Sequence, residues 1–188
     1  MFILYPLLIA ILLAFVTGGR IDRLADLHLR WWGVALGGLL VQVILFSPLG
    51  ESLAGIGPLV YVASTAAVFT TVLANLRRPG VALVAIGAFL NLAAIVANGG
   101  YMPTTSGALL AAGKDPAHGY SNSIELTQPR LAPLTDLFGI PSVVPLANVF
   151  SVGDVCIGSG IAWLAFSTMR GRPEDADESH PPSTTAEY

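Results

Sequence analysis

Charged residues are scarce in this sequence: Asp, Glu, Lys and Arg together make up 11% of its 188 residues. A soluble domain carries about 25%, so this chain has too few charges to cover a water-facing surface. Hydrophobic residues make up 54% and stand in long blocks, which indicates that lipid surrounds much of the chain. The net charge is −3 and no dense basic run occurs, so nothing supports binding to nucleic acid.

Catalytic and metal-binding motifs are also missing. The single cysteine, Cys156, cannot form an internal disulfide, and no Cys/His cluster has the spacing of metal ligands. The sequence has no phosphate-binding loop, no H-E-x-x-H and no C-x-x-C. Gly158-Ser159-Gly160 is not the nucleophile elbow of a hydrolase. We therefore predict no catalytic residue, no metal and no cofactor, and the sequence leans away from an enzyme.

Five apolar segments approach the length that crosses a bilayer, which is about 20 residues in a helix. They do not alternate between apolar and polar residues, so helices rather than β-strands are expected. We predict an all-α fold, an integral membrane bundle of about five transmembrane helices in a domain of residues 1–170. The predicted spans are about 2–17, 31–49, 58–76, 81–98 and 147–169. Residues 171–188 are acidic and poor in apolar residues, which predicts a disordered cytoplasmic tail.

Basic residues mark one side of this predicted bundle. They lie in the first and third connections and after the last span, at Arg20, Arg23, Arg30, Arg77, Arg78, Arg170 and Arg172. Short basic connections stay in the cytoplasm, so we expect the N-terminus outside and the C-terminus inside.

The connection at residues 99–146 falls on the outer side and is too long for a simple link. Loops beyond about 12–15 residues are usually functional or disordered, and this one is rich in Leu, Ile and Tyr. We predict that it packs as a lid on the outer face of the bundle. Short helices are expected at residues 106–112 and 134–139.

Asp154 is the only carboxylate inside a predicted span. A charged Asp at the centre of a membrane helix costs about 2.5–3.5 kcal/mol, and Asp154 is expected about two turns from the outer end. It is either an acid at a helix N-terminus, favoured by the helix dipole, or a contact for an ion, a proton or a ligand. The candidate contacts for a ligand, an ion or a partner are Asp154, Asn148, Ser151, Asn98 and Tyr101. For Asn98-Gly-Gly-Tyr-Met-Pro103 the competing reading is a helix C-terminus.

Other small or polar residues in the spans predict helix packing. Gln42, Asn75, Asn91 and Asn98 are expected to join helices through hydrogen bonds worth on the order of 1 kcal/mol each. Glycines permit close approach of helices, in the pair Gly33 and Gly37 and in the group Gly153, Gly158 and Gly160.

Several short motifs resemble a known family. They are Gly-Gly-Arg after the first span, Leu-Arg-Trp-Trp, Phe-Ser-Pro-Leu-Gly, Asn98-Gly-Gly-Tyr-Met-Pro103 and Asn148-Val-Phe-Ser-Val-Gly-Asp154. Together they resemble the bacterial membrane family of unknown function DUF5317 over nearly the whole chain except the acidic tail. The resemblance implies a small multi-pass protein of the bacterial inner or plasma membrane, and it carries no assigned activity.

Three functional hypotheses follow. The leading one is a non-enzymatic accessory protein whose lid and Asp154 region bind a partner or a lipid. Its partners would be the lipid bilayer and a membrane protein or a second copy of the chain. The second is a small oligomeric transporter or an ion- or proton-conducting protein that uses Asp154. The third is an interfacial lipid-modifying enzyme, which would need clustered acids where the outer face offers only the scattered Asp115, Glu125, Asp136 and Asp154.

Overall fold

The computed structural model describes residues 2–47, 49, 55–114 and 123–171. The tail predicted for residues 171–188 lies outside this part of the chain, apart from Gly171. Five long helices dominate the described part, and each lies within or close to one of the predicted segments. They are α1 (Leu4–Val16), α2 (Trp32–Leu45), α3 (Gly57–Ala74), α4 (Val81–Ala97) and α6 (Val152–Arg170). The first four contain no charged residue, and Leu, Ala and Val supply most of their length.

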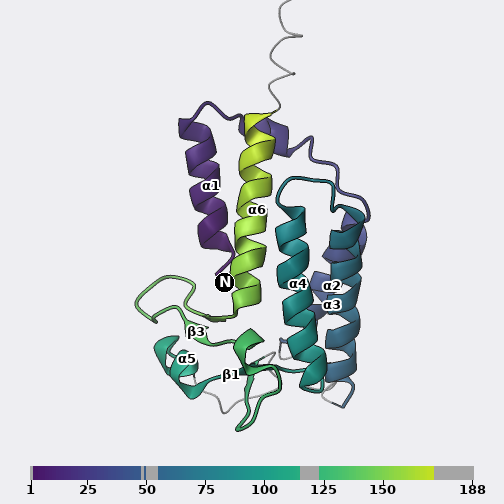
Figure 1. Cartoon of the computed structure of the whole chain (residues 1–188), viewed down its shortest axis with the longest axis vertical. Coiled ribbons are helices and arrows are strands. Elements are labelled where there is room, and N and C mark those ends of the chain that lie inside the picture. The colour runs from purple at the N-terminus through teal and green to yellow at the C-terminus, as the bar shows by residue number, and fades with distance from the viewer. Residues whose placement is uncertain (1, 48, 50–54, 115–122, 172–188) are drawn as a thin grey trace, which may run out of the picture.

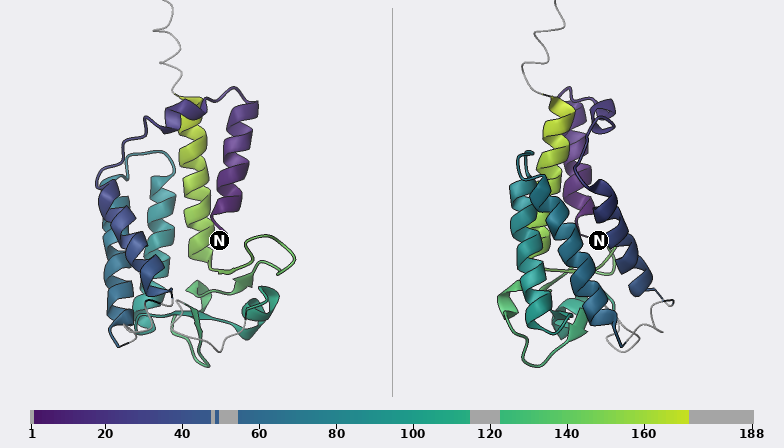
Figure 2. Two further views of the ribbon diagram at one scale, coloured as in Figure 1. Left: turned by 180° about the vertical axis from the view of Figure 1, so that it is seen from behind. Right: turned by 90° about the vertical axis from the view of Figure 1, so that its right-hand side faces the viewer.

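The helices form an open bundle rather than a closed ring (Figures 1 and 2). Helix α6 packs against α1 on one side and α4 on the other, and α3 joins α4 to α2. The described residues of 98–151, which are called the outer segment below, gather at the end where α1, α3 and α6 begin. The basic connections lie at the opposite end, where α1, α3 and α6 finish.

Helix α6 begins later than predicted. It starts at Val152, whereas the predicted span started at residue 147. Val149 and Phe150 instead form strand β4, which pairs antiparallel with β3 (Phe138–Gly139). The Asn148 carbonyl also accepts a hydrogen bond from the Ile140 amide at 2.9 Å. These backbone groups are already satisfied by the outer segment, so the helix cannot extend back through them.

The fold is mostly helical, as predicted, but the outer segment also contains short strands that the prediction did not include. Strand β1 (Met102–Thr104) pairs in parallel with β2 (Ser123–Glu125). The helix predicted at residues 106–112 is present as α5 (Ser106–Ala111). Its N-cap is Thr105, whose hydroxyl accepts a hydrogen bond from the Ala108 amide at 3.2 Å.

The helix predicted at residues 134–139 is absent. A single 3₁₀ turn, η3 (Ala132–Leu134), comes before it, and the chain is then extended. The Asp136 amide donates to the Pro103 carbonyl at 2.9 Å, and the Thr104 hydroxyl donates to the Asp136 carbonyl at 3.1 Å. The pairing with β1 therefore replaces the local hydrogen bonds that a helix would need.

Glycines bring α4 and α6 into backbone contact. Gly80 lies against Gly160, and Gly87 lies against Gly153, in an antiparallel arrangement. A Cβ atom on Gly80 or on Gly87 would come within 2.3 Å of the carbonyl oxygen of the opposite glycine. Both helices therefore carry a small residue at matching positions seven residues apart, about two turns. Gly158 likewise allows the close approach of α1 to α6, since a Cβ atom on Gly158 would lie 2.9 Å from the Pro6 ring.

The predicted close approach at Gly33 and Gly37 is not used within the chain. A Cβ atom on either residue would meet no described atom within 4 Å. The neighbouring Gly38 makes the contact of α2 with α3, with Val68 and the Ser64 carbonyl near its Cβ position. Only the rotation of α2 about its axis distinguishes these three glycines.

The outer faces of the helices are apolar. Leu8, Val43 and Phe89 are 62%, 66% and 57% exposed, and similar side chains cover much of α1 and α2. Two helices, Gly57–Ala74 and Val152–Arg170, are long and apolar enough to span a membrane, and α1, α2 and α4 are shorter apolar helices. By length and composition this gives a mostly helical chain with two candidate membrane-spanning helices.

Candidate functional site

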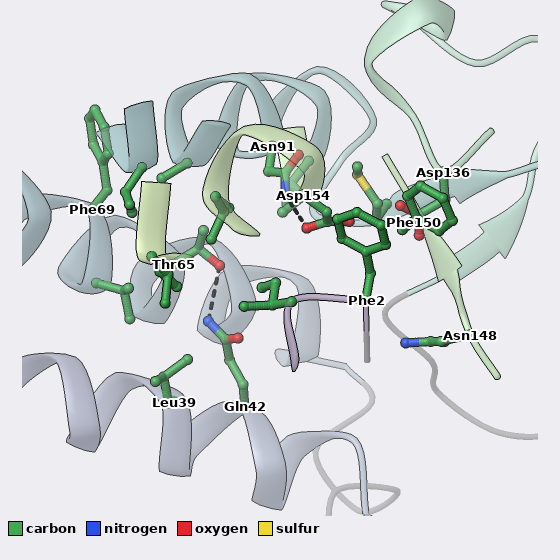
Figure 3. A pocket seen from close by; sticks show the side chains of 18 of the residues that line it. Phe2, Leu39, Gln42, Thr65, Phe69, Asn91, Asp136, Asn148, Phe150 and Asp154 are labelled. Atoms are coloured by element: carbon green, nitrogen blue, oxygen red, sulfur yellow. Dashed lines mark hydrogen bonds between the residues drawn. The ribbon is translucent and has the colours of Figure 1, made fainter. Parts of the chain in front are cut away.

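A closed polar cluster joins α4 to the beginning of α6. Its members are Asn91, Ser151 and Asp154. The dashed line in Figure 3 marks the hydrogen bond between Asn91 and Asp154. Asn91 Nδ2 donates to Asp154 Oδ1 at 2.9 Å. Ser151 Oγ lies 2.8 Å from Asn91 Oδ1 and 3.1 Å from Asp154 Oδ2, and its one hydrogen can be donated to either acceptor.

Two of these residues, Ser151 and Asp154, also cap helix α6. The Asp154 amide donates to Ser151 Oγ at 3.0 Å, and the Ser151 amide donates to Asp154 Oδ2 at 3.0 Å. This reciprocal pair is a capping box with Asp in the third helical position. The carboxylate also lies where the positive end of the helix dipole stabilises it. The N-terminal reading of Asp154 therefore has direct structural support.

A cavity of about 610 Å³ opens beside this cluster. Its walls come from the beginning of α1, from α2, α3, α4 and α6, and from the outer segment (Figure 3). Helices α1 and α2 line it from different sides, because α2 packs on α3 and α1 packs on α6. The volume lies within the range of about 300–1,000 Å³ typical of sites for small molecules.

The polar groups of the cavity all lie in its outer part, where they are mixed with apolar side chains such as Ile95, Met102 and Phe150, and its deeper part is apolar. Its polar lining comes from residues toward the outer ends of the helices and from the outer segment, namely Gln42, Thr65, Asn91, Asp136, Asn148 and Asp154. The deeper lining is apolar, with Val68, Phe69, Val72, Val84, Ala88, Ile157 and Ile161. The distance along α6 from Asp154 to Ile161 is about 10 Å at 1.5 Å per residue.

Two polar wall residues are held by neighbouring helices. Gln42 Nε2 donates to Ser64 Oγ at 3.3 Å and to Thr65 Oγ1 at 3.2 Å, which joins α2 to α3.

An aromatic stack lies at another edge of the cavity. Phe150 of β4 stacks on Phe2 with ring centroids 4.3 Å apart, and also on Phe138 at 5.3 Å. These contacts connect the beginning of α1 to the outer segment at the edge of the cavity.

The structure separates the five predicted contact residues. Asp154 and Asn148 line the cavity, and Ser151 is fully buried behind Asp154. Asn148 accepts a hydrogen bond from the exposed Lys114 through Oδ1. Tyr101 is half-buried and, like Asn98, is not among the residues that line the cavity.

Asn98 holds the outer segment in place. It is the C-cap of α4; its Nδ2 donates to the Arg130 carbonyl and its Oδ1 accepts from the Arg130 amide, both at 2.8 Å. Asn75, the C-cap of α3, makes the same pair of bonds with the backbone of Arg30 at the other end of the bundle. Each asparagine thus satisfies both backbone groups of one arginine in a connection, as a neighbouring β-strand would.

Asn91 is the site residue that the sequence reasoning did not include. The sequence predicts that Asn91 joins two helices, but the acid that it contacts lies 63 residues away. The available signal was the matching seven-residue spacing of Gly80 and Gly87 with Gly153 and Gly160. In antiparallel helices that spacing sets a register in which Asn91 faces the beginning of α6.

The cavity and the polar cluster beside it are the features that could bind a ligand. Within the described ranges there is no group of three or more His, Cys, Asp or Glu that could hold a metal ion. Asp154 is engaged by Ser151 and Asn91, and neither neighbour is a titratable base. What the site provides is a cavity with a polar end and an apolar end.

Comparison with known proteins identifies a family but no activity. No curated protein matches the chain, and no solved structure matches it. Residues 26–166, which extend from the connection before α2 nearly to the end of α6, match a family described as a family of unknown function, DUF5317. The chain belongs to this family, DUF5317.

Proposed function

We propose that this protein is a multi-pass membrane protein that binds a lipid-like amphiphile in the cavity beneath its outer segment. Five helices, α1 to α4 and α6, would cross the bilayer, and residues 99–146 would form a lid on the outer side. The single observation that carries the proposal is the cavity, with polar groups at the lid and apolar side chains below. The proposal is a binding role without catalysis.

The membrane location is supported by the surfaces of the helices. Soluble monomers rarely expose apolar patches larger than a few hundred Å², whereas here large apolar side chains are exposed on α1, α2 and α4. Arg20, Arg23, Arg30, Arg77, Arg78 and Arg170 lie at one end of the bundle, whereas Lys114 and Arg130 lie in the outer segment. By the positive-inside rule this end is cytoplasmic, which places the lid and the N-terminus outside.

The length of the shorter helices is compatible with this placement. Helix α1 has 13 residues and α2 has 14, or about 20 Å each at 1.5 Å per residue. The hydrocarbon core is about 30 Å thick, and shorter spans are accommodated by local thinning and by flanking residues. Trp31 and Trp32 stand at the beginning of α2, at the basic end, where aromatic residues favour the interface.

The contacts of Asp154 favour a binding role over ion transport. The acid caps α6 and bonds to Asn91, so its cost of burial is already offset by fixed donors. A coupling acid in transport would have to exchange these donors in each cycle. We therefore propose that Asp154 is a fixed polar group of the cavity wall.

The test is native mass spectrometry of the protein extracted gently from its own membrane. Ala88 lines the cavity, so Ala88→Phe would occupy part of its volume. The matched control is Ala82→Phe, because Ala82 lies on the same helix at an exposed position. We expect a bound amphiphile on the wild type and on Ala82→Phe, and none on Ala88→Phe.

Two results would count against the proposal. One is a wild-type protein free of bound amphiphile, and the other is equal occupancy in both phenylalanine variants. Membrane placement is tested separately by cysteines introduced at Thr127 in the lid and at Asp26 in the first connection. An impermeant thiol reagent applied to intact cells should label the cysteine at 127 and leave the one at 26 unlabelled.

A further inference from the structure

Arginines without an acidic partner collect at the end of the bundle opposite the outer segment. The connections at residues 17–31 and 75–80 lie at this end, and α6 finishes there at Arg170. Together these parts contain six arginines and two aspartates, a net charge of +4. Arg20 pairs with Asp22, and none of the other five arginines forms an ion pair with a described residue. These five are called the arginine surface below: Arg23, Arg30, Arg77, Arg78 and Arg170.

The connection between α1 and α2 gathers these arginines at one surface. Its 3₁₀ turn, η1 (Ile21–Leu24), packs on α6 (Figure 1). Its later part lies at the end of α3, where Arg78 Nη2 donates to the His28 carbonyl at 2.9 Å. Asn75 bonds there to both backbone groups of Arg30. Arginines from three segments of the chain therefore lie along one connection, whose backbone is held by the helices beneath it.

Most guanidinium donors of the arginine surface remain available. A guanidinium group has five N–H donors. Arg23, Arg78 and Arg170 each use one nitrogen atom on a backbone carbonyl. The Arg77 side chain is exposed and makes no hydrogen bond or ion pair with a described residue. The remaining donors can bind a phosphate group, for which the planar guanidinium is well shaped.

Apolar side chains lie beside the arginines on the same connection. Ile21, Trp31 and Trp32 are exposed, and the Arg30 guanidinium lies 5.9 Å from the centre of the Trp31 ring. Trp residues favour the level of the lipid head groups. Clusters of four to eight basic residues directly beside the cytoplasmic ends of membrane helices are typical of sites for anionic lipids.

We infer that the arginine surface binds the head groups of anionic phospholipids in the cytoplasmic leaflet. The basis is charge complementarity between unpaired guanidinium groups and the lipid phosphate. A zwitterionic head group gains less, because its own cation offsets the phosphate charge. The inference rests on the membrane placement in the proposed function, and it names a lipid site at the opposite end of the bundle from the outer segment.

The experiment titrates the full chain in an uncharged detergent with phosphatidylglycerol or with phosphatidylcholine of the same acyl chains. Native mass spectrometry counts the lipid molecules that are bound at each concentration. Ala88→Phe is measured beside the wild type, because its filled cavity removes lipid bound there. In both proteins we expect phosphatidylglycerol to bind at least about tenfold more tightly than phosphatidylcholine. The preference should shrink as the ionic strength rises, since exposed charges are screened by salt.

Matched variants assign the preference to the arginine surface. Arg77→Gln removes one charge and no contact within the described chain, so the variant should fold as the wild type does. It should lower the affinity for phosphatidylglycerol about fivefold, whereas Arg77→Lys should keep most of it. The control is Arg130→Gln, which removes an exposed arginine from the outer segment and should leave the affinity unchanged.

Three results would overturn the inference. The first is equal binding of the two lipids to the wild type, and the second is an equal effect of Arg77→Gln and Arg130→Gln. The third is a preference that appears only in a chain ending at Gly171, since the five acids of residues 172–188 would then be the occupant of the surface.

The outcomes also separate this inference from the proposed function. A preference for phosphatidylglycerol that is lost in Ala88→Phe would place the anionic lipid in the cavity and overturn the inference alone. A preference that persists in Ala88→Phe, in a protein that carries no amphiphile from its own membrane, would support the arginine surface while the proposed cavity ligand fails.

Discussion

A single methyl group at Gly87 tests how the two halves of the bundle are joined. A Cβ atom on Gly87 would lie 2.3 Å from the Gly153 carbonyl oxygen and 2.8 Å from the Ile157 amide nitrogen. Both neighbours are helix backbone, which cannot rotate away as a side chain would. Gly87→Ala therefore has to push α4 and α6 apart or shift one along the other.

The expected cost has two parts. Overpacking of a tight contact costs about 1–3 kcal/mol. Separating the helices also weakens the Asn91 hydrogen bonds to Asp154 and Ser151, which are each worth about 0.6 kcal/mol on average between membrane helices. The intrinsic gain from replacing a mid-helix glycine by alanine is about 0.5–1 kcal/mol. We expect a net loss of about 1–3 kcal/mol.

Gly37→Ala in α2 is the matched control. Gly37 lies within a helix and its Cβ would meet no described atom within 4 Å, so the variant should be neutral or stabilised by up to about 1 kcal/mol. Thermal denaturation in one detergent, followed by the fraction that remains monodisperse, compares the variants. Equal stability of Gly87→Ala and Gly37→Ala would refute the backbone contact of α4 with α6.

Two further predictions concern residues that fix the ends of helices. Asn98→Leu removes both hydrogen bonds to the Arg130 backbone, so the protein should lose about 1–3 kcal/mol and trypsin should cut after Arg130 faster. Asn75→Leu should have a similar cost while leaving cleavage after Arg130 unchanged, and accelerated cleavage in both variants would contradict a local role for Asn98. Ser151→Ala removes the cap of α6 and should cost about 1 kcal/mol in thermal stability. Ser159→Ala, at an exposed position of the same helix, should cost nothing measurable, and a loss as large as that of Ser151→Ala would argue against the cap.

The positions of the helices followed from local sequence. Long apolar blocks, Pro58 at the beginning of α3 and the absence of charge within α1 to α4 are properties of contiguous residues. Helical hydrogen bonds join residues four apart, so a local pattern is sufficient to locate a helix. The helix at residues 106–112 was located for the same reason.

The errors arose where distant segments supply the hydrogen bonds. Residues 147–151 read as the beginning of a helix, but Asn148 and Val149 pair with residues 139 and 140. Asp136 likewise bonds to Pro103 and Thr104 rather than to its own neighbours. Pairing between such distant residues leaves no periodic signal in either segment.

The candidate site was half visible in the sequence. Asp154 stood out because it is the lone acid in an apolar segment, and Ser151 stood out as a candidate contact beside it. The structure shows that the two residues form a capping box. Asn98 looked equally suitable, yet it faces the Arg130 backbone instead of the cavity. The motif that contains it therefore anchors the outer segment at that residue.

By itself the sequence determined the helical segments, their apolar character and the collection of arginine at the connections of one end. Tertiary structure alone decided that Asn91 meets Asp154, that Gly38 rather than Gly37 contacts α3, and that two aspartates line one cavity. The physical reason is that composition and local spacing fix the position and the apolar character of each helix. The order and rotation of the helices in the bundle fix which side chains meet.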